Sequence, residues 1–239
     1  VSSTLISKAI RELDKASAMG EGKKLFDANL AIYKLLRYGV SVQESIGVNF
    51  ETVYFIDWEN PEENDFAIAE EVSIKGENKK RPDIVIYVNG IALGVIELKR
   101  SGVSVAEGIR QNLDNQNKTF IRDFFTTMQL VTAGNDTEGL RYGTIETAEK
   151  YYLSWKEENP TYNPKEDHKN SKYIPCPDDV NVLDCSISKM FDKERFLEFI
   201  HDFIVFDSGV KKTCRQNQYF GVKAAQRHIA SREGGIIWH

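Results

Sequence analysis

The chain has 239 residues, of which 41% are hydrophobic and 28% charged, so it can bury a core like an ordinary globular protein. No apolar run approaches the roughly 18 residues of a membrane span, and no signal peptide opens the chain. The formal net charge of −5 means that a nucleic acid would have to be met by a local basic patch or by other subunits.

The three cysteines are widely spaced and lie far from any cluster of histidines. This pattern predicts neither a zinc site nor a disulfide framework, and it favours a cytoplasmic location. The chain opens without methionine and stops at GGIIWH, within an apolar segment. We therefore expect a fragment of a longer protein.

The hydrophobic pattern of the N-terminal half predicts helices first and strands afterwards. Two helices are expected within residues 1–48, and strands at 51–58 and 66–74. Residues 83–98 read as a β-hairpin, and residues 103–125 carry helical periodicity.

Further along, residues 128–133 and 141–145 read as short buried strands. Four of the six prolines then fall within 159–179, which predicts a linker or exposed loop. Amphipathic helices are expected at 187–200 and 216–232. This order of elements predicts a mixed α/β (α+β) fold, with a central sheet flanked by helices.

We predict three parts: a domain over residues 1–158, a linker over 159–180 and a short helical unit over 181–239.

The hairpin RPDIVIYVNGIALGVIELK carries Asp83 at its entrance, and Glu97 and Lys99 at its exit. With a strict two-residue loop, Asp83 would lie opposite Ile96, and Glu97 would point to the other face of the sheet. A three-residue loop with Gly90 in the left-handed region instead puts Asp83 on the face of Glu97 and Lys99. We therefore expect an odd loop, opposing Asp83 to Val95, with Gly90 setting the register.

These residue types fit a magnesium-dependent hydrolase. Mg²⁺ prefers hard oxygen ligands, which Asp83, Glu97 and the backbone carbonyl of Leu98 can supply. Lys99 can orient a water and offset charge on phosphorus. The alternative is a solvated strand face, but charges that interrupt a long apolar hairpin need a partner or a metal.

The combination of Pro82-Asp83 with Glu97-x-Lys99 resembles the PD-(D/E)xK nuclease superfamily. Its surroundings resemble one family in particular, the motor (R, HsdR) subunit of type I restriction enzymes. The resemblance rests on Asn64-Asp65-Phe66, the hairpin, the segment from Val131 to Asn135, and HDFIVFD with the RQNQYFGVKAAQRHI and GGIIWH that follow.

That resemblance implies a PD-(D/E)xK endonuclease domain followed by the start of a RecA-like helicase. Asp83 and Glu97 would be metal ligands, and Lys99 the water-orienting residue, in Mg²⁺-dependent cutting of double-stranded DNA. In the intact subunit, cutting would follow ATP-driven translocation, after methyltransferase and specificity subunits recognise the site.

The family's Gln-x-x-x-Tyr pattern, which supports the site, is matched here by Gln111, whereas Asn115 stands where the tyrosine is expected. Arg215, Gln218 and Tyr219 fall where the family recognises adenine. The alternative for this segment is a helix start with core aromatics. A phosphate-binding loop should come after GGIIWH, so we expect no ATP hydrolysis by this chain.

The four histidines lie scattered and are expected to be structural. A local phosphate-binding patch is expected among the cations Lys99, Arg100, Arg110, Lys118 and Arg122, although a charged helix face explains the last three equally well. Two rival functions remain open: a nuclease of another ATP-dependent restriction or repair system, and a catalytically silent DNA-binding or docking module.

Overall fold

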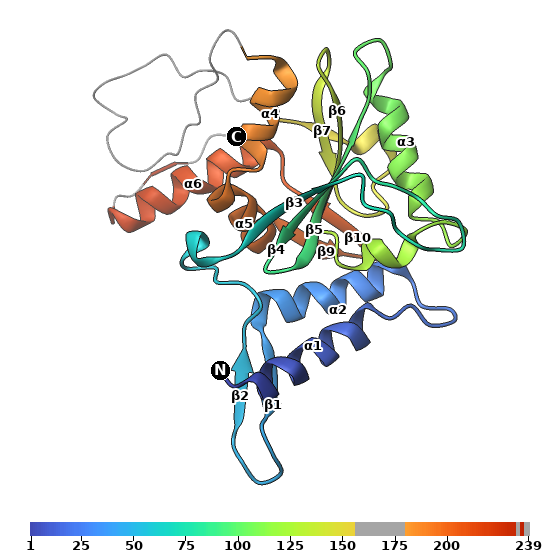
Figure 1. The fold of residues 1–239 in the computed structure, drawn as a ribbon. Helices are drawn as coiled ribbons and strands as arrows, with labels where there is room; N and C mark the ends of the chain where they lie inside the picture. Colours follow the sequence, from blue (N-terminus) through green and yellow to red (C-terminus); the bar gives the residue numbers. More distant parts are fainter. Residues whose placement is uncertain (156–179, 233–234, 237–239) are drawn as a thin grey trace.

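The computed structural model of the chain describes residues 1–155, 180–232 and 235–236. A six-stranded sheet in the order β3-β4-β5-β6-β7-β8 forms its centre (Figure 1). Its strands are Phe66–Glu70, Ile84–Val88, Ile91–Leu98, Leu130–Asn135, Gly139–Gly143 and Leu153–Ser154. β5 and β6 run parallel and the other neighbours antiparallel, so the predicted mixed α/β fold is confirmed.

The part of the chain that the structure describes also contains six α-helices and two smaller hairpins. The helices are α1 Ser3–Ser17, α2 Leu25–Tyr38, α3 Val105–Asn115, α4 Val182–Met190, α5 Lys193–Asp202 and α6 Gln216–Ala230. The hairpins pair β1 Val40–Gln43 with β2 Phe50–Val53, and β9 Ile204–Asp207 with β10 Val210–Thr213. Short 3₁₀ turns lie at Pro61–Glu63 (η1), Arg122–Thr126 (η2) and Glu149–Tyr151 (η3).

Several predicted boundaries are wrong. The helix expected over 103–125 ends at Asn115, because the polar segment that follows folds into turns before η2. The helix expected over 187–200 is two helices, and Asp192 caps the second by accepting a hydrogen bond from the backbone of Arg195. The strand expected at 51–58 is β2, which pairs with β1 outside the central sheet.

The two faces of the central sheet are covered by different parts of the chain. On one face, Val85, Val95 and Val131 pack with Ile121 and Phe125, beside α3, which contacts β5 and β6. The opposite face is covered by residues from α2, α4, α5 and α6. Residues 180–219 therefore contribute to the same core as the sheet.

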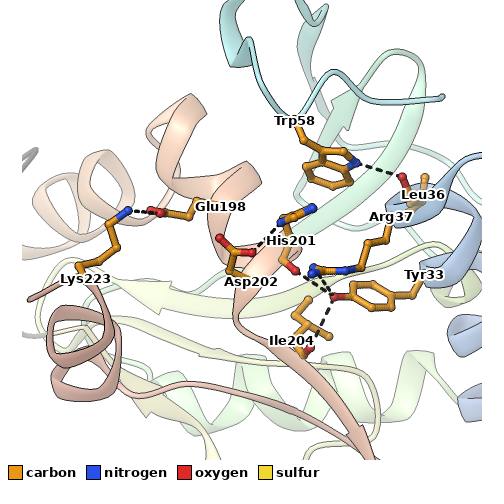
Figure 2. Close-up of polar contacts among 9 residues, drawn as sticks. All are labelled: Tyr33, Leu36, Arg37, Trp58, Glu198, His201, Asp202, Ile204 and Lys223. Atoms are coloured by element: carbon orange, nitrogen blue, oxygen red, sulfur yellow. Dashed lines mark hydrogen bonds and ion pairs between the residues drawn. The ribbon is translucent and has the colours of Figure 1, made fainter. Parts of the chain in front are cut away.

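Polar contacts also join α5 and the segment after it to the N-terminal part of the chain (Figure 2). The hydroxyl of Tyr33, on α2, donates to the backbone carbonyl of His201 at 3.2 Å. The indole nitrogen of Trp58 donates to the carbonyl of Leu36 at 3.2 Å, and its ring lies 5.0 Å from that of His201. These contacts hold α5 against α2.

The predicted linker at 159–180 and most of the segment GGIIWH lie outside the described residues. Within the described part, no helix is long and apolar enough to cross a membrane. Cys214 is a free thiol, whereas Cys185 is disulfide-bonded. The sequence argues against a disulfide framework, but an odd number of cysteines leaves room for a single bond, and Cys185 takes part in one.

Candidate functional site

The turn of the β4–β5 hairpin differs from our expectation. Val88 pairs with Ile91, so the loop has two residues, Asn89 and Gly90. Both have positive φ, 49° and 79°, as a type I′ turn requires. The predicted three-residue loop, and with it the role of Gly90 in setting the register, is wrong.

A β-bulge inside the hairpin supplies the register shift instead. Tyr87 pairs with Ala92 but Ile86 pairs with Gly94, so Leu93 is an extra residue in β5. Leu93 is buried on the α5 side of the sheet, and a Cβ on Gly94 would meet Phe196 of α5 on that same side. The alternation of side chains is thus offset by one residue beyond the bulge.

This offset brings the two carboxylates onto one face. Ile84 pairs with Ile96, and one more step of the same register places Asp83 opposite Glu97, rather than opposite Val95 as expected. Both then lie on the side of Val85 and Val95, the face that α3 covers. Asp83 is fixed by a hydrogen bond of 2.7 Å from the backbone N–H of Leu98 to its Oδ2.

Glu97 is a buried acid in an incomplete polar setting. Glu97 is 1% exposed, and its Oε1 accepts a hydrogen bond from Lys99 Nζ at 2.9 Å. Oε2 is buried without a hydrogen-bond partner among the described residues. Burial raises the pKa of Glu97 to about 7, against the lowering effect of the Lys99 hydrogen bond and with a further rise from Asp83.

Lys99 is held by three oxygen atoms. Besides Glu97, its Nζ donates to Gln111 Oε1 at 2.8 Å and to the carbonyl of Leu98 at 3.3 Å. Gln111 lies on α3, which starts with Ser104 as its N-cap. The structure thus brings Asp83, Glu97, Lys99 and Gln111 together.

Asn115 lies one turn beyond Gln111 and is 1% exposed. Its backbone carbonyl accepts a hydrogen bond from Ile121 at 3.2 Å, whereas its side-chain Oδ1 has no partner among the described residues. Asn115 has no aromatic ring that could stack as the family's tyrosine would. Any support that it lends to the site is therefore polar.

Gly108 is a residue of the site that the sequence reasoning missed. A Cβ at Gly108 would lie 3.0 Å from Cβ of Ala133, 3.4 Å from Cγ of Lys99 and 3.6 Å from Cγ of Glu97. The missing side chain lets α3 approach β5 and β6 closely enough for Gln111 to reach Lys99. A lone glycine within a helical pattern was the only signal that could have indicated this contact.

The donor set fits a hard divalent cation. Within the described residues, no group of three or more His, Cys, Asp or Glu side chains could hold a metal ion. Asp83 and Glu97 nevertheless provide two carboxylates with the Leu98 carbonyl beside them, and the unpartnered Oε2 of Glu97 has no protein donor to satisfy it. Mg²⁺ is commonly held by one or two carboxylates together with waters and substrate oxygens.

Within the described part of the chain, the other residues singled out from the sequence make no hydrogen bond or ion pair with Asp83, Glu97 or Lys99. Arg110 forms ion pairs with Glu107 and Glu149, so it is not available to a phosphate patch in the way expected. At the start of α6, Gln218 Oε1 accepts a hydrogen bond from the backbone of Arg215 at 2.8 Å. Tyr219 is buried in the core, with its hydroxyl bonded to Glu198.

A cleft of about 1160 Å³ lies elsewhere, between residues 54–64 and α5. Its lining includes Asp57, Glu198 and Asp202. The lining contains none of the residues that cluster around Glu97, so this cleft is separate from the cluster.

The fold and the cluster define a class: a mixed α/β domain with two acids and a lysine at the end of a central hairpin. The family described as type I restriction enzyme R protein N terminus matches residues 3–150. This chain belongs to that family, which confirms the resemblance to the type I R subunit.

Curated relatives agree. The chain is 27% identical, over 87% of its length, to the putative type I restriction enzyme MjaIXP endonuclease subunit of Methanocaldococcus jannaschii. It is 26% identical, over 98% of its length, to the type I restriction enzyme HindI endonuclease subunit of Haemophilus influenzae. A further M. jannaschii relative, the putative MjaVIIP endonuclease subunit, is 30% identical over 85% of the chain. The chain spans 22%, 23% and 19% of the length of these relatives, respectively.

Proposed function

We propose that this chain is the endonuclease part of a type I restriction enzyme R subunit and that it hydrolyses phosphodiester bonds of double-stranded DNA. The observation that carries the proposal is the buried Glu97, whose Oε2 is unpartnered, next to Asp83 and Lys99. A buried carboxylate oxygen without a hydrogen-bond partner is costly in a folded protein and is most simply explained by a ligand. The relatives named as endonuclease subunits support the same activity.

Magnesium, when bound, would be held by Asp83, Glu97 and the Leu98 carbonyl, and would supply positive charge to the phosphate and acidify a bound water. Lys99 offers its ammonium group at the same place, where it stabilises negative charge that develops on the phosphate oxygens. Gln111 and Glu97 orient Lys99 by accepting two of its hydrogen bonds. Asp83 is held in place by the Leu98 N–H.

The assembly context is a proposal that rests on the resemblance to the type I R subunit, and the relatives are longer than this chain. We expect ATP-driven translocation by a motor, and recognition of the DNA site by methyltransferase and specificity subunits. We expect Arg215 and Gln218 to contact adenine in that context. An enzyme that cuts DNA inside the cell would work in the cytoplasm.

The test is nicking of supercoiled plasmid by the chain, with and without Mg²⁺. Asp83→Asn keeps the size of the side chain but removes the charge, and Lys99→Met removes the ammonium group. We expect each to lower the cutting rate at least about 100-fold, since groups acting on a developing charge contribute on this scale.

Glu51→Gln and Lys34→Met are matched controls at exposed positions, and we expect them to cut like the wild type. Circular dichroism melting of every variant separates lost chemistry from lost folding. Undiminished cutting by Asp83→Asn or Lys99→Met would refute the assignment of the site. Cutting at the same rate without Mg²⁺ would refute the proposed requirement for the metal.

A further inference from the structure

Two basic segments beside the site are packed into one rigid surface. Residues 74–80 form a loop that is closed by backbone hydrogen bonds of 2.9 and 3.2 Å between Ile74 and Lys80. The side chain of Asn78 donates to the carbonyl of Thr119 at 2.7 Å. A Cβ on Gly76 would lie 1.9 Å from the carbonyl oxygen of Phe120, so the two backbones touch where only glycine fits.

This surface carries an excess of positive charge. We call it the basic shelf and define it by five side chains: Lys75, Lys79, Lys80, Lys118 and Arg122. Lys80 Nζ lies 4.1 Å from the centre of the Phe120 ring. The other four make no ion pair with any residue that the structure describes, although the carboxylates of Glu77 and Asp123 lie in the same segments.

Exposed cations elsewhere on the molecule are often neutralised. Arg81 pairs with Glu71 at 3.1 Å, and Lys212 pairs with Asp207 at 2.6 Å. In a chain of net charge −5, a rigid group of unpaired cations stands out against this background. Because the contacts between the two basic segments already fix their backbone, little backbone has to become ordered when an anion binds.

The basic shelf lies beside the site. Ile121, between Lys118 and Arg122 in the turn, packs in the same cluster as Val85 and Val95, on the face of the sheet that bears Asp83 and Glu97. Lys80 precedes Asp83 by three residues, so their Cα atoms are at most about 11 Å apart. Phosphates of one DNA strand follow each other about every 3.4 Å along the helix axis, so the shelf reaches phosphates about three nucleotides from one held at Asp83.

A hollow of about 410 Å³ adjoins the shelf. Its lining includes Phe120, the cations Lys23, Lys75, Lys118 and Arg122, and the acids Glu21, Glu77 and Asp123. The four cations outnumber the three carboxylates, so the hollow adds a small excess of positive charge next to the shelf.

We propose that the basic shelf binds the phosphate backbone of double-stranded DNA and positions the duplex over Asp83 and Glu97. This inference rests on the proposed function and extends it with residues that hold the substrate rather than cut it. The shelf contacts phosphates regardless of base sequence.

The experiment measures binding of the chain to a fluorescent 20-base-pair duplex by anisotropy, without divalent metal, from 50 to 200 mM salt. Two double variants remove shelf charge: Lys75→Gln with Lys79→Gln, and Lys118→Gln with Arg122→Gln. For each, we expect weaker binding at 50 mM salt. The slope of log K against log salt should flatten by up to about 1.8, or 0.9 for each lost phosphate contact.

The matched control removes two exposed cations away from the shelf, with Lys34→Gln and Arg227→Gln. We expect its slope to equal that of the wild type. If the shelf variants bind with an unchanged slope while the wild type binds and cuts DNA, the shelf inference is overturned and the proposed function stands. If the wild type binds no duplex, both are overturned.

Discussion

At the scale of single residues, the site depends on how Lys99 is held. Its ammonium group has three donors, and Glu97, Gln111 and the Leu98 carbonyl accept one each. A lysine with all its donors directed has few orientations left, so its positive charge is fixed beside Glu97. Gln111 is the acceptor that comes from a different element, and it therefore couples α3 to the hairpin.

Gln111→Leu is predicted to lower kcat about 10- to 100-fold and to leave the Kd for DNA unchanged. A hydrogen bond to a charged group contributes about 1.5–3 kcal/mol, and each 1.4 kcal/mol is a factor of ten in rate. Gln111→Glu keeps an acceptor for Lys99 and should restore most of the rate. Single-turnover cutting and anisotropy binding separate the two quantities. A Kd that weakens as much as kcat falls would show that Gln111 binds DNA instead.

The residue types of the site could be predicted from the sequence, because Asp83, Glu97 and Lys99 interrupt an otherwise apolar hairpin. The ion pair between Arg110 and Glu149 could not be predicted from the sequence. Glu149 lies 39 residues away from Arg110 in the chain, and no local pattern predicts that contact.

At the scale of elements, the decisive feature is the bulge in β5. The loop has two residues, Asn89 and Gly90, where we expected three, because a two-residue loop alone would place Asp83 and Glu97 on opposite faces. The need for one extra residue in the hairpin could be argued from the sequence, because two carboxylates that share a metal must lie on one face of the sheet. Its place could not, because Leu93-Gly94 reads as an ordinary apolar strand and the approach of Phe196 to Gly94 comes from a helix about 100 residues further along the chain.

The close approach of α3 to the sheet yields a second prediction. Gly108→Ala puts a methyl group 3.0 Å from Cβ of Ala133, which is tighter than ordinary contact. We expect α3 to move outward and the Gln111–Lys99 contact to lengthen, with a loss of kcat of about tenfold. Ala133→Gly in the same chain removes the opposing methyl group and should restore cutting. Failure of this double variant to recover, in a chain that melts like the wild type, would contradict a role for Gly108 in spacing.

The β9–β10 hairpin is joined to the rest of the fold by a buried lysine. Lys211 donates to Asn29 Oδ1 at 2.8 Å, to Gln129 Oε1 at 2.7 Å and to the Met128 carbonyl at 3.1 Å. Burial lowers the pKa of Lys211 well below its usual value of 10.5. Between the folded-state pKa and 10.5, the unfolded chain therefore binds a proton that the folded chain does not.

The free energy of unfolding of the wild type should accordingly rise with pH through that window, relative to Lys211→Met, by up to about 1.4 kcal/mol per pH unit. Below the folded-state pKa both states are protonated, and the difference between the two proteins stays constant. Urea unfolding from pH 6 to pH 9.5 measures this difference. Lys212→Met, at the exposed neighbouring position, should show no such slope. A flat difference for Lys211→Met across the range would contradict a lowered pKa.

At the scale of the whole molecule, the sequence predicts a division that remains to be tested. The prolines of 159–179 favour separate units before and after them. In the structure, however, residues of α4, α5 and α6 share one hydrophobic cluster with the central sheet. Composition can locate a segment that lacks a core, but it cannot show that the segments on either side pack against each other.

Phe196→Ala tests whether that shared core makes one cooperative unit. Phe196, on α5, is 1% exposed and lies against the β5 bulge at Gly94. Its truncation should lower the free energy of unfolding by about 3–5 kcal/mol, as for other buried phenylalanines. If the sheet and the C-terminal helices unfold together, denaturation monitored by far-UV circular dichroism and by loss of plasmid cutting will shift to the same lower midpoint.

Phe50→Ala, at a position that is 65% exposed, is the control for a lost phenylalanine and should change stability by less than about 0.5 kcal/mol. Two separate transitions in Phe196→Ala, with cutting retained after the first, would instead support independent domains. A single shifted transition means that the helices after the proline-rich segment are needed to keep the hairpin, its bulge and the pair Asp83–Glu97 in register.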